Sequence, residues 1–469
     1  MTEVQALFAA LRQSADPAVV SAIERLVGDA PDRQLNRVNA LAFAGANGLS
    51  EDRVIAAFLH ATRLGMFESS WNVLCPGCGG VLDAGASLKT VNRAEYACAL
   101  CAVGYEPTLD EMVEVTFTVT PRARRIAAHS PHELPAIEYY RQIFWGSGID
   151  LPEGALERAL KGIALEMAEV PPGENVMLSL SLPSEFVIVF DPVTHTAQFI
   201  DVKGEPTRDG QELTTVFKPG GSPNATIVMR PGPLRLMLDN RTDTRVVPGV
   251  FVAGQDMHDM LGKRRPFLTA KRLLTNQTFR EIYRTSTLDI DQRLKITSLT
   301  FLFTDLKGST DLYERVGDLV AFDIVNEHFR ILHEIIAAES GAVVKTIGDA
   351  VMATFPTPDR ALAAALRIRE AMQAMKAKHR NEDLLVKMGI HEGPCLAVTL
   401  NDRQDYFGQT VNIAARVQGL ADSRSILATR SIVDHPGASR LLEADGIKPT
   451  ARWVPVRGIA HDLAVFEIP

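Results

Sequence analysis

Two Cys-x-x-Cys pairs constrain the fold of this chain more than any other feature of its sequence. The pairs are Cys75-x-x-Cys78 and Cys98-x-x-Cys101, with 19 residues between them. Each pair forms a tight turn, and the four thiolates together complete a tetrahedral zinc site with no open position. We therefore expect residues 71–105 to form a zinc ribbon that holds one structural Zn²⁺ per chain. A redox role is disfavoured because two such pairs would be redundant, and a ribbon that has lost its metal is the alternative.

The composition of the chain is that of a soluble globular protein. No segment approaches the roughly 20 apolar residues that a membrane helix needs, and the N-terminus lacks the basic and apolar stretches of a secretory signal. These features predict a cytoplasmic protein without a membrane segment, in which thiols stay reduced and bind metal. The formal charge of −8 argues against a protein built to coat nucleic acid, so we expect no nucleic-acid partner.

Residues 1–70 have the pattern of a helical segment. Within it Ser50 is placed to cap a helix, and Glu51 and Asp52 follow in the first turn, where they suit the helix dipole. A DNA-reading helix–turn–helix is one interpretation of this segment. Its second helix would turn both carboxylates toward phosphate, which is repulsive, so we favour a packed helical pair.

The middle of the chain changes to a strand pattern. Residues 106–265 contain stretches such as EMVEVTFTVTP, which alternate apolar and polar residues and are bounded by Pro, Gly and Asn turns. We interpret this region as a β-rich antiparallel sandwich with a regulatory role and a helical interruption near residues 132–170. Residues 266–296 follow as one helix, over 269–286, and a connector.

Residues 297–469 mix strands and helices in the manner of an α+β domain. Their first strand ends at Asp305 in FLFTDLKGST, and Asp349 lies at the mouth of a hairpin in VVKTIGDAVMATF. Carboxylates from separate strands repel one another unless a cation lies between them, and Mg²⁺ suits that task. Free N–H groups at the helix start after Asp305 favour phosphate oxygens, and an Asx-turn or a helix cap is the alternative role for Asp305. The residues of this helix start are Gly308, Ser309 and Thr310.

A polar pair lies on a later helical stretch, DYFGQTVNIAARV. Asn412 and Arg416 are four residues apart and therefore share one face of a helix. An amide and a guanidinium side by side suit a phosphoryl oxygen and the charge that develops on it. This segment alone leaves open that the two residues are an ordinary surface pair.

Three stretches, in this order and at this spacing, resemble the catalytic domain of the class III nucleotide cyclases: FTDLKGST, VVKTIGDAVMATF and DYFGQTVNIAARV. The resemblance covers about residues 297–469 and implies an α+β fold with a ferredoxin-like core. It implies that a pair of Mg²⁺ or Mn²⁺ ions is held by Asp305, Asp349 and the backbone carbonyl of Leu306. It implies that the purine is read by Lys345 and Asp405. The ribose and the transition-state phosphate would be held by Asn412 and Arg416, and the terminal phosphates by Arg457 in VPVRGI.

The purine readers indicate the substrate. A Lys donor matches the ring acceptor N1 of adenine and an Asp acceptor matches its N6 amino group, whereas guanine would leave both side chains unpaired at about 1–3 kcal/mol each. In the family, guanylate cyclases replace this pair with residues such as Glu and Cys. Lys345 with Asp405 therefore predicts an adenylate cyclase that converts ATP into 3′,5′-cyclic AMP and pyrophosphate. A guanylate cyclase, or a non-catalytic signalling or DNA-binding module, is the alternative.

The resemblance also implies a partner. In the family the aspartates serve one active site, while the base readers, Asn412 and Arg416 serve another, so two chains must pack head-to-tail as a homodimer. The N-terminal half is similar to that of some bacterial cyclases, where it is described as a region of unknown function. We expect it to regulate the catalytic domain through residues 266–296, in response to an unknown ligand or protein.

Overall fold

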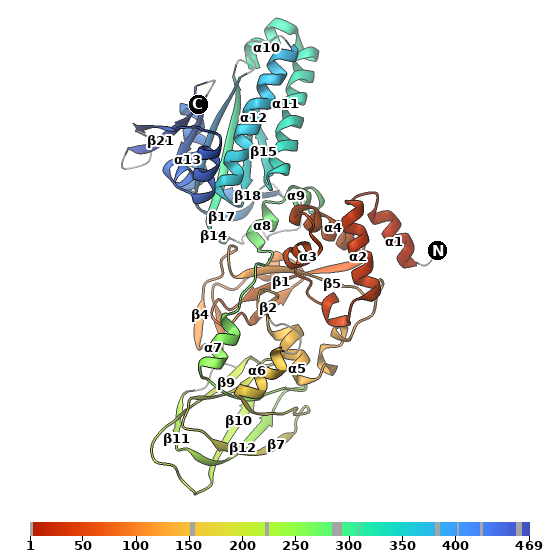
Figure 1. Cartoon of the computed structure of the whole chain (residues 1–469), viewed down its shortest axis with the longest axis vertical. Coiled ribbons are helices and arrows are strands. Elements are labelled where there is room, and N and C mark those ends of the chain that lie inside the picture. The colour runs from red at the N-terminus through yellow and green to blue at the C-terminus, as the bar shows by residue number, and fades with distance from the viewer. Residues whose placement is uncertain are drawn as a thin grey trace. The chain divides into compact units, whose positions relative to one another are not determined.

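The computed structural model of the chain contains two compact units. It describes residues 3–150, 155–220, 225–283, 293–307, 309–379, 385–400, 403–422, 425–455 and 462–469. The first unit comprises Met1–Pro107 and Glu111–Leu268, and the second comprises Thr108–Asp110 and Thr269–Pro469 (Figure 1). No helix in the described ranges combines the length and the apolar character needed to cross a membrane.

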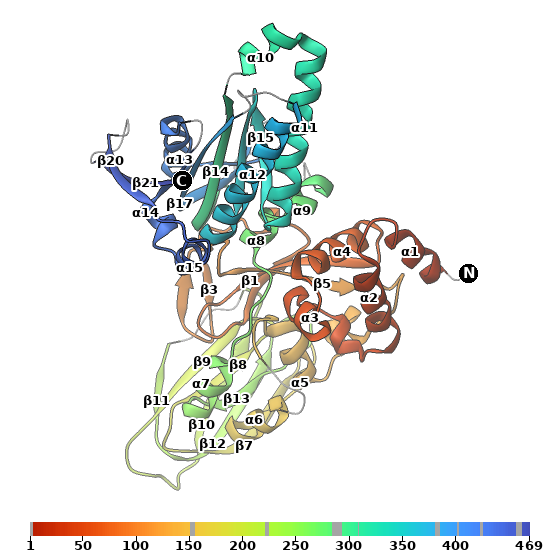
Figure 2. The ribbon, with the colours of Figure 1, turned by 45° about the horizontal axis from the view of Figure 1, so that its top comes forward.

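The first unit opens with a layer of helices on a small antiparallel sheet of order β2-β1-β5 (Figure 2). Side-chain oxygens of Asp16 and Asn39 cap α2 and α3, as expected for residues that accept from free N–H groups. Ser50 precedes α4 but makes no capping bond with its side chain. Phe58 stacks on Phe117 at 5.0 Å between ring centres, which joins helix layer to sheet. The elements are α1 (Glu3–Leu11), α2 (Pro17–Asp29), α3 (Ala40–Asn47), α4 (Glu51–Arg63), β1 (Phe67–Leu74), β2 (Val81–Gly85) and β5 (Val113–Val119).

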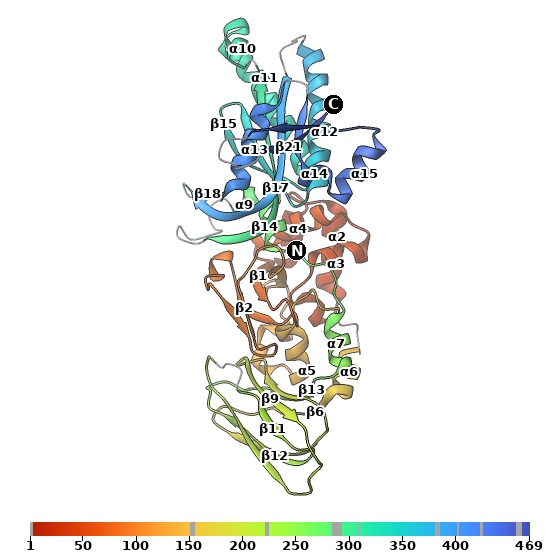
Figure 3. The same cartoon turned by 90° about the vertical axis from the view of Figure 1, so that its left-hand side faces the viewer.

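The rest of the first unit contains a short hairpin, several helices and two further sheets. The sheets have the strand orders β10-β12-β7 and β11-β9-β8-β13-β6 (Figure 3), and one cluster of buried apolar residues draws on both. The hairpin and helices are β3 (Tyr96–Cys98), β4 (Val103–Tyr105), α5 (Ala136–Tyr139), α6 (Ala155–Ile163) and α7 (Gln255–Gly262). The strands are β6 (Ala164–Met167), β7 (Asn175–Leu182), β8 (Val187–Asp191), β9 (Thr196–Val202), β10 (Gln211–Phe217), β11 (Ile227–Met229), β12 (Gly232–Asn240) and β13 (Gly249–Val252).

The prediction of a purely antiparallel arrangement is wrong for two of these pairs. β10 pairs with β12 in parallel, and β11 pairs with β9 in parallel. Between β10 and β12 the chain crosses to the other sheet to form β11, so it re-enters the first sheet in the direction in which it left. Period-two alternation cannot reveal this, because it is the same for a parallel and an antiparallel neighbour.

The second unit is built on one long sheet of order β15-β16-β14-β17-β19-β21-β20, with β18 paired to β17. Helices α11 and α12 pack side by side on one face (Figures 1 and 2). Helix α13 packs on the other face. Ile426 and Ala428 of β19 belong to the apolar cluster beneath α11 and α12, whereas Leu427 between them belongs to a separate cluster with Val417 of α13. This unit confirms the α+β fold predicted for the C-terminal region.

The elements of the second unit are α8 (Ala270–Leu274), α9 (Gln277–Ile282), β14 (Leu294–Lys307), α10 (Ser309–Val316), α11 (Asp318–Ala338), β15 (Ala342–Ile347), β16 (Ala350–Phe355), α12 (Pro358–His379), β17 (Leu385–Leu400), β18 (Arg403–Phe407), α13 (Gln409–Leu420), β19 (Ile426–Thr429), α14 (Arg430–Val433), α15 (Pro436–Ala444), β20 (Thr450–Val454) and β21 (Leu463–Ile468). The single helix predicted over 269–286 is wrong over residues 269–283, and residues 284–286 lie outside the described ranges. Asn276 accepts from Phe279 N at 3.0 Å and starts a second helix, because a short polar side chain competes with the helix backbone for hydrogen bonds.

Candidate functional site

The four paired cysteines converge in the first unit. Their sulfur atoms all lie within 4.8 Å of one another; Cys75 and Cys101 are 3.6 Å apart, and Cys78 and Cys98 are 3.7 Å apart. The sequence folds this way because β1 ends next to the first pair and the β3–β4 hairpin carries the second. Hydrogen bonds from the neighbouring thiols, that of Cys101 first, hold the pKa of Cys75 well below its usual value. Four soft donors at this spacing could hold one metal ion.

A pair of carboxylates lies at one end of the sheet in the second unit. Asp305 is near the end of β14, and Asp349 is in the turn between β15 and β16, directly after Gly348 at φ +65°. Burial, and next the negative charge of Asp349, raise the pKa of Asp305, while Lys387 and a hydrogen bond with Gln418 lower it. A bound divalent cation would relieve the repulsion between these two acids.

The neighbours of Asp305 differ in what they can offer. Leu306 is 2% exposed and packs into the core, so only its main chain could reach an ion. Ser309 and Thr310 open α10, which puts their backbone N–H groups at a helix start. Gly308 and Arg457, predicted to contact phosphate, lie outside the described residues.

Lys345 of β15 and Asp405 of β18 form an ion pair, although these strands are far apart in the strand order. The distance from Nζ to Oδ2 is 2.5 Å, and the exposed fractions of the two side chains are 43% and 11%. The second oxygen of Asp405 accepts from Tyr406 N at 2.9 Å. The pair therefore combines a fixed, nearly buried acceptor with an exposed and adjustable donor.

Asn412 and Arg416 lie together on the outer face of α13. Thr410, Ala414 and Val417 of that helix are buried, whereas Asn412 and Arg416 are exposed. Within the described ranges neither side chain has a hydrogen-bond or ion-pair partner. Both groups are exposed, as a contact with a substrate or with a second chain would require.

Arg280 of α9 is a residue that the sequence did not single out. Its Nη2 atom donates to the backbone carbonyl of Gln404 at 2.9 Å and to that of Val344 at 3.3 Å. Those residues directly precede Asp405 and Lys345, so one guanidinium joins the two strands beside the ion pair. No motif could have revealed this role, because the acceptors are main-chain oxygens 64 and 124 residues away.

Two family models match the chain. One is described as a family of unknown function (DUF5939) and matches residues 1–281. The other is described as the adenylate and guanylate cyclase catalytic domain and matches residues 292–442. Together they cover all the polar positions discussed above except Arg457.

Individual relatives match over part of this chain. Adenylate cyclase 2 from Rhizobium meliloti is 33% identical over 182 residues, which is 36% of this chain and 49% of the relative. Guanylate cyclase 32E from Drosophila melanogaster is 29% identical over 140 residues, which is 27% of this chain and 12% of the relative. The chain thus spans half or less of the length of these curated relatives. Among solved structures, the adenylyl cyclase CyaB from P. aeruginosa is 22% identical, covers 38% of this chain and 96% of its own, and has a TM-score of 0.34.

Proposed function

The chain belongs to the family of unknown function DUF5939 and carries a class III adenylate/guanylate cyclase catalytic domain in its C-terminal part, and from this premise we propose that it is an adenylate cyclase. The proposed reaction converts ATP into 3′,5′-cyclic AMP and pyrophosphate. The observation that carries the choice of ATP is the ion pair between Lys345 and Asp405.

The ion pair suits adenine for a chemical reason. Lys offers only donors and ionised Asp only acceptors, and adenine presents an acceptor at N1 and a donor at N6. The purine edge would enter between Nζ of Lys345 and the carboxylate of Asp405, replacing one contact by two. Asp405 stays in place because Tyr406 N holds its other oxygen. Guanine would meet a donor with a donor and an acceptor with an acceptor, which costs about 1–3 kcal/mol per unpaired group.

Class III cyclases use divalent metal ions, and the acids of this chain fit such ions. Asp305, Asp349 and the main-chain carbonyl of Leu306 would hold them, since the two carboxylates are near enough for one to raise the pKa of the other. When bound, Mg²⁺ or Mn²⁺ neutralises phosphate charge and acidifies the ribose 3′-hydroxyl.

The remaining residues position the reactants. The 3′-oxygen of the ribose attacks the α-phosphorus in line, its proton leaves, and the bond to pyrophosphate breaks. Asn412 orients the ribose, and Arg416 donates to the oxygens on which negative charge develops. No side-chain nucleophile is needed, so catalysis depends on positioning and electrostatics.

We propose that two chains share each active site. Asn412 and Arg416 are exposed and have no partner within the described part of one chain, although they are the groups that should contact the reacting phosphate. Large apolar side chains on and beside β18 and α13 are also exposed, which suits a face that a second copy covers. They are Leu400 (49%), Phe407 (66%) and Leu420 (39%).

The shared site has a direct test by mixing variants. Asp305→Ala and Arg416→Ala homodimers should each be inactive, because every site lacks a metal ligand or the phosphate contact. A mixture should regain activity, since each heterodimer contains one intact site. A mixture of Asp305→Ala with Asp349→Ala is the control and should stay inactive. Absence of rescue in the first mixture would overturn the shared-site proposal.

The substrate is tested on the purified full-length chain with ATP and with GTP, in the presence of Mn²⁺. We expect cyclic AMP from ATP and at least about tenfold less cyclic GMP from GTP. Preferential turnover of GTP would replace the proposal by a guanylate cyclase. Turnover of neither nucleotide would favour a non-catalytic module.

We propose that the N-terminal region regulates the cyclase through α8 and α9. These helices lie in the stretch matched by the family of unknown function, yet they cluster with the second unit. Besides the contacts of Arg280, Gln277 Oε1 accepts from Val343 N of β15 at 2.9 Å. A displacement of α9 would therefore move the strands that carry Lys345 and Asp405.

A second segment of the N-terminal region lies in the same unit. Thr108 bridges in parallel to Lys295 at the start of β14, and Asp110 forms an ion pair with Lys271 of α8 at 3.1 Å. Comparing the full chain with residues 269–469 and with residues 293–469 tests the role of these contacts. We expect three different specific activities, and equal values would remove the case for regulation.

We assign the metal of the cysteine cluster as one structural Zn²⁺ and place the protein in the cytoplasm, where the thiols stay reduced. Four thiolates leave no open position, so this ion would stabilise the fold and take no part in catalysis. Elemental analysis of the purified chain should give about one zinc per chain, and iron or no metal would contradict the assignment.

A further inference from the structure

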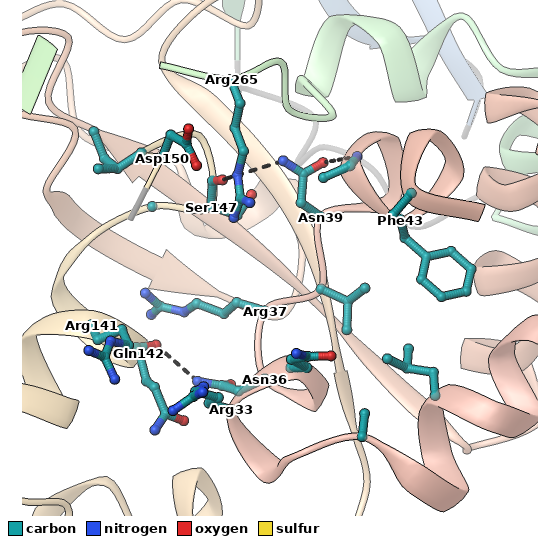
Figure 4. Close-up of a pocket in the computed structure, with 18 of the residues that line it drawn as sticks. Arg33, Asn36, Arg37, Asn39, Phe43, Arg141, Gln142, Ser147, Asp150 and Arg265 are labelled. Atoms are coloured by element: carbon teal, nitrogen blue, oxygen red, sulfur yellow. Dashed lines mark hydrogen bonds between the residues drawn. The ribbon is translucent and has the colours of Figure 1, made fainter. Parts of the chain in front are cut away.

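A cavity of about 690 Å³ lies in the first unit (Figure 4). Its walls come from α2, from α3 and the segment before it, and from residues 141–150. Five arginines line it against two aspartates, Asp29 and Asp150. The arginines are Arg25, Arg33, Arg37, Arg141 and Arg265.

The positive charge of this cavity is only partly neutralised by the protein. Glu138 and Glu157 form ion pairs with Arg141. Within the described ranges Arg25 and Arg37 have no ion-pair partner. An excess of guanidinium groups in a concave site attracts anions, because the walls exclude water and strengthen the field.

Arg37 is held in the cavity at a cost to the fold. Its backbone φ is +48°, a left-handed conformation that is uncommon for a residue other than glycine. Burial lowers the pKa of its guanidinium, and the negative charge of Glu114 raises it. Glu114 also accepts from Ser147 N at 2.7 Å and from Asn72 at 3.0 Å. These donors are neutral, so the charge of Glu114 remains beside Arg37. A strained and desolvated cation on the wall of a cavity favours a binding role.

Figure 4 shows Arg33, Arg37 and Arg141 on the same side of the cavity, near Asn36 and Gln142. The side chain of Arg37 donates to Ile143 O, and Asn36 donates to Gln142 O at 2.9 Å. These bonds fix the wall before any ligand arrives, which lowers the entropy cost of binding.

The geometry points to a binding site for a small organic anion that carries at least two phosphate or carboxylate groups. Arginine forks pair with both kinds of group in a bidentate manner. A cavity of this volume falls within the range of about 300–1,000 Å³ that is typical for small-molecule sites, and it exceeds what one inorganic ion needs. Val38, Ala42 and Phe43 line the cavity as well and would contact the carbon skeleton of the ligand.

The bound anion would also regulate cyclic AMP formation. This regulatory role rests on the proposed cyclase function, whereas the binding of the anion does not. Arg265 donates to Ser147 O at 2.7 Å, and Pro266 O accepts from Asn39 at 2.9 Å, so the cavity wall includes the stretch that leads into α8. An occupant that pairs with Arg265 would act on this stretch.

The test is calorimetric titration of the full-length protein, at constant ionic strength, with fructose 1,6-bisphosphate and with tricarballylate. We expect saturable binding of at least one probe with Kd below about 1 mM. Binding should weaken at least about tenfold in Arg37→Gln and in Arg25→Gln. Because Arg25 is exposed, the Arg25→Gln variant should fold whether or not Arg37→Gln does. Arg63→Gln, at the exposed end of α4 outside the cavity, is the matched control and should bind as the wild type does.

The outcomes separate the two proposals. Binding of the bisphosphate alone identifies a phosphorylated ligand, and binding of tricarballylate alone identifies a polycarboxylate. If neither probe binds, or if both cavity variants bind like Arg63→Gln, the site is overturned. Cyclic AMP production is measured in parallel. A wild type that binds a probe but forms no cyclic AMP contradicts the cyclase proposal and leaves the anion site standing.

Discussion

The two candidate metal sites of this protein differ in almost every physical respect. The cysteine cluster consists of four soft donors, three of them buried, whose sulfur atoms lie within 4.8 Å of one another. The carboxylate site consists of two hard donors, Asp305 and Asp349, which are partly exposed at the end of a sheet. The first set is complete within one unit of one chain. In the proposed function the second would leave coordination positions for a substrate, and its companions Asn412 and Arg416 have no partner among the residues that the structure describes.

This difference shows that the number of protein ligands decides whether a metal site can stabilise the fold or take part in a reaction. A closed set of four ligands can hold an ion and a fold together, but it cannot admit a reactant. An open pair of acids contributes little to the fold and can admit phosphate oxygens. We therefore expect changes at the two sites to have opposite effects on stability and on activity.

The largest effect on activity is expected at the carboxylate site. Asp349→Asn should lower the rate of cyclic AMP formation by about 10³-fold or more, because it removes a metal ligand. The melting temperature should stay near that of the wild type, since relieving the repulsion with Asp305 offsets the lost charge. Rates and thermal melts are compared with those of Asp323→Asn, an exposed acid on α11. A variant that melts early but keeps its activity would reverse the comparison.

The cysteine cluster should give the opposite result. Cys98→Ser should abolish zinc binding and lower the free energy of unfolding of the first unit by several kcal/mol, since metal binding and folding are coupled. Calorimetry and zinc content measure these effects, and Cys395→Ala, a lone buried cysteine of β17, is the control. Loss of cyclase chemistry at a temperature where both units remain folded would contradict a purely structural role.

A smaller effect is expected on the preference for ATP over GTP when the two base readers are replaced. Lys345→Glu combined with Asp405→Cys should reduce the ratio of kcat/KM for ATP to that for GTP by about 100-fold, because each base reader contributes about 1–3 kcal/mol of discrimination. The carboxylate site is untouched in this variant, so the metal dependence should not change. An unaltered ratio would show that other groups read the purine.

The smallest expected effect concerns Arg280, which acts through the base readers. Arg280→Gln should raise KM for ATP by about 3–10-fold and leave kcat nearly unchanged, since the guanidinium positions the strands and contacts no reactant. Arg280→Lys should recover part of the affinity if one donor suffices. Asp323→Asn, the exposed acid on α11, is again the control. A fall in kcat with KM unchanged would contradict the positioning role.

The sequence was most informative where chemistry is local. The spacing of the cysteine pairs predicted that four thiols would meet. The pattern of strands and helices in residues 297–469, together with the resemblance of three stretches to a known family, predicted the α+β fold of the C-terminal region. The roles of the individual site residues stay predictions. The one-helix interpretation of 269–286 failed because it passed over Asn276, whose side chain starts α9.

What only the tertiary structure decided are the contacts between distant segments. Lys345 meets Asp405 across non-adjacent strands, Arg280 joins the main chains beside them, and the arginines of the cavity come from four stretches of the chain. Short-range patterns record which face of an element is apolar and how its ends are capped. They do not record where the chain returns, because a parallel crossover, a main-chain acceptor and a cavity wall leave no periodic or motif signal of their own. The sequence by itself therefore determined the donor chemistry, and the packing within each unit decided which donors meet.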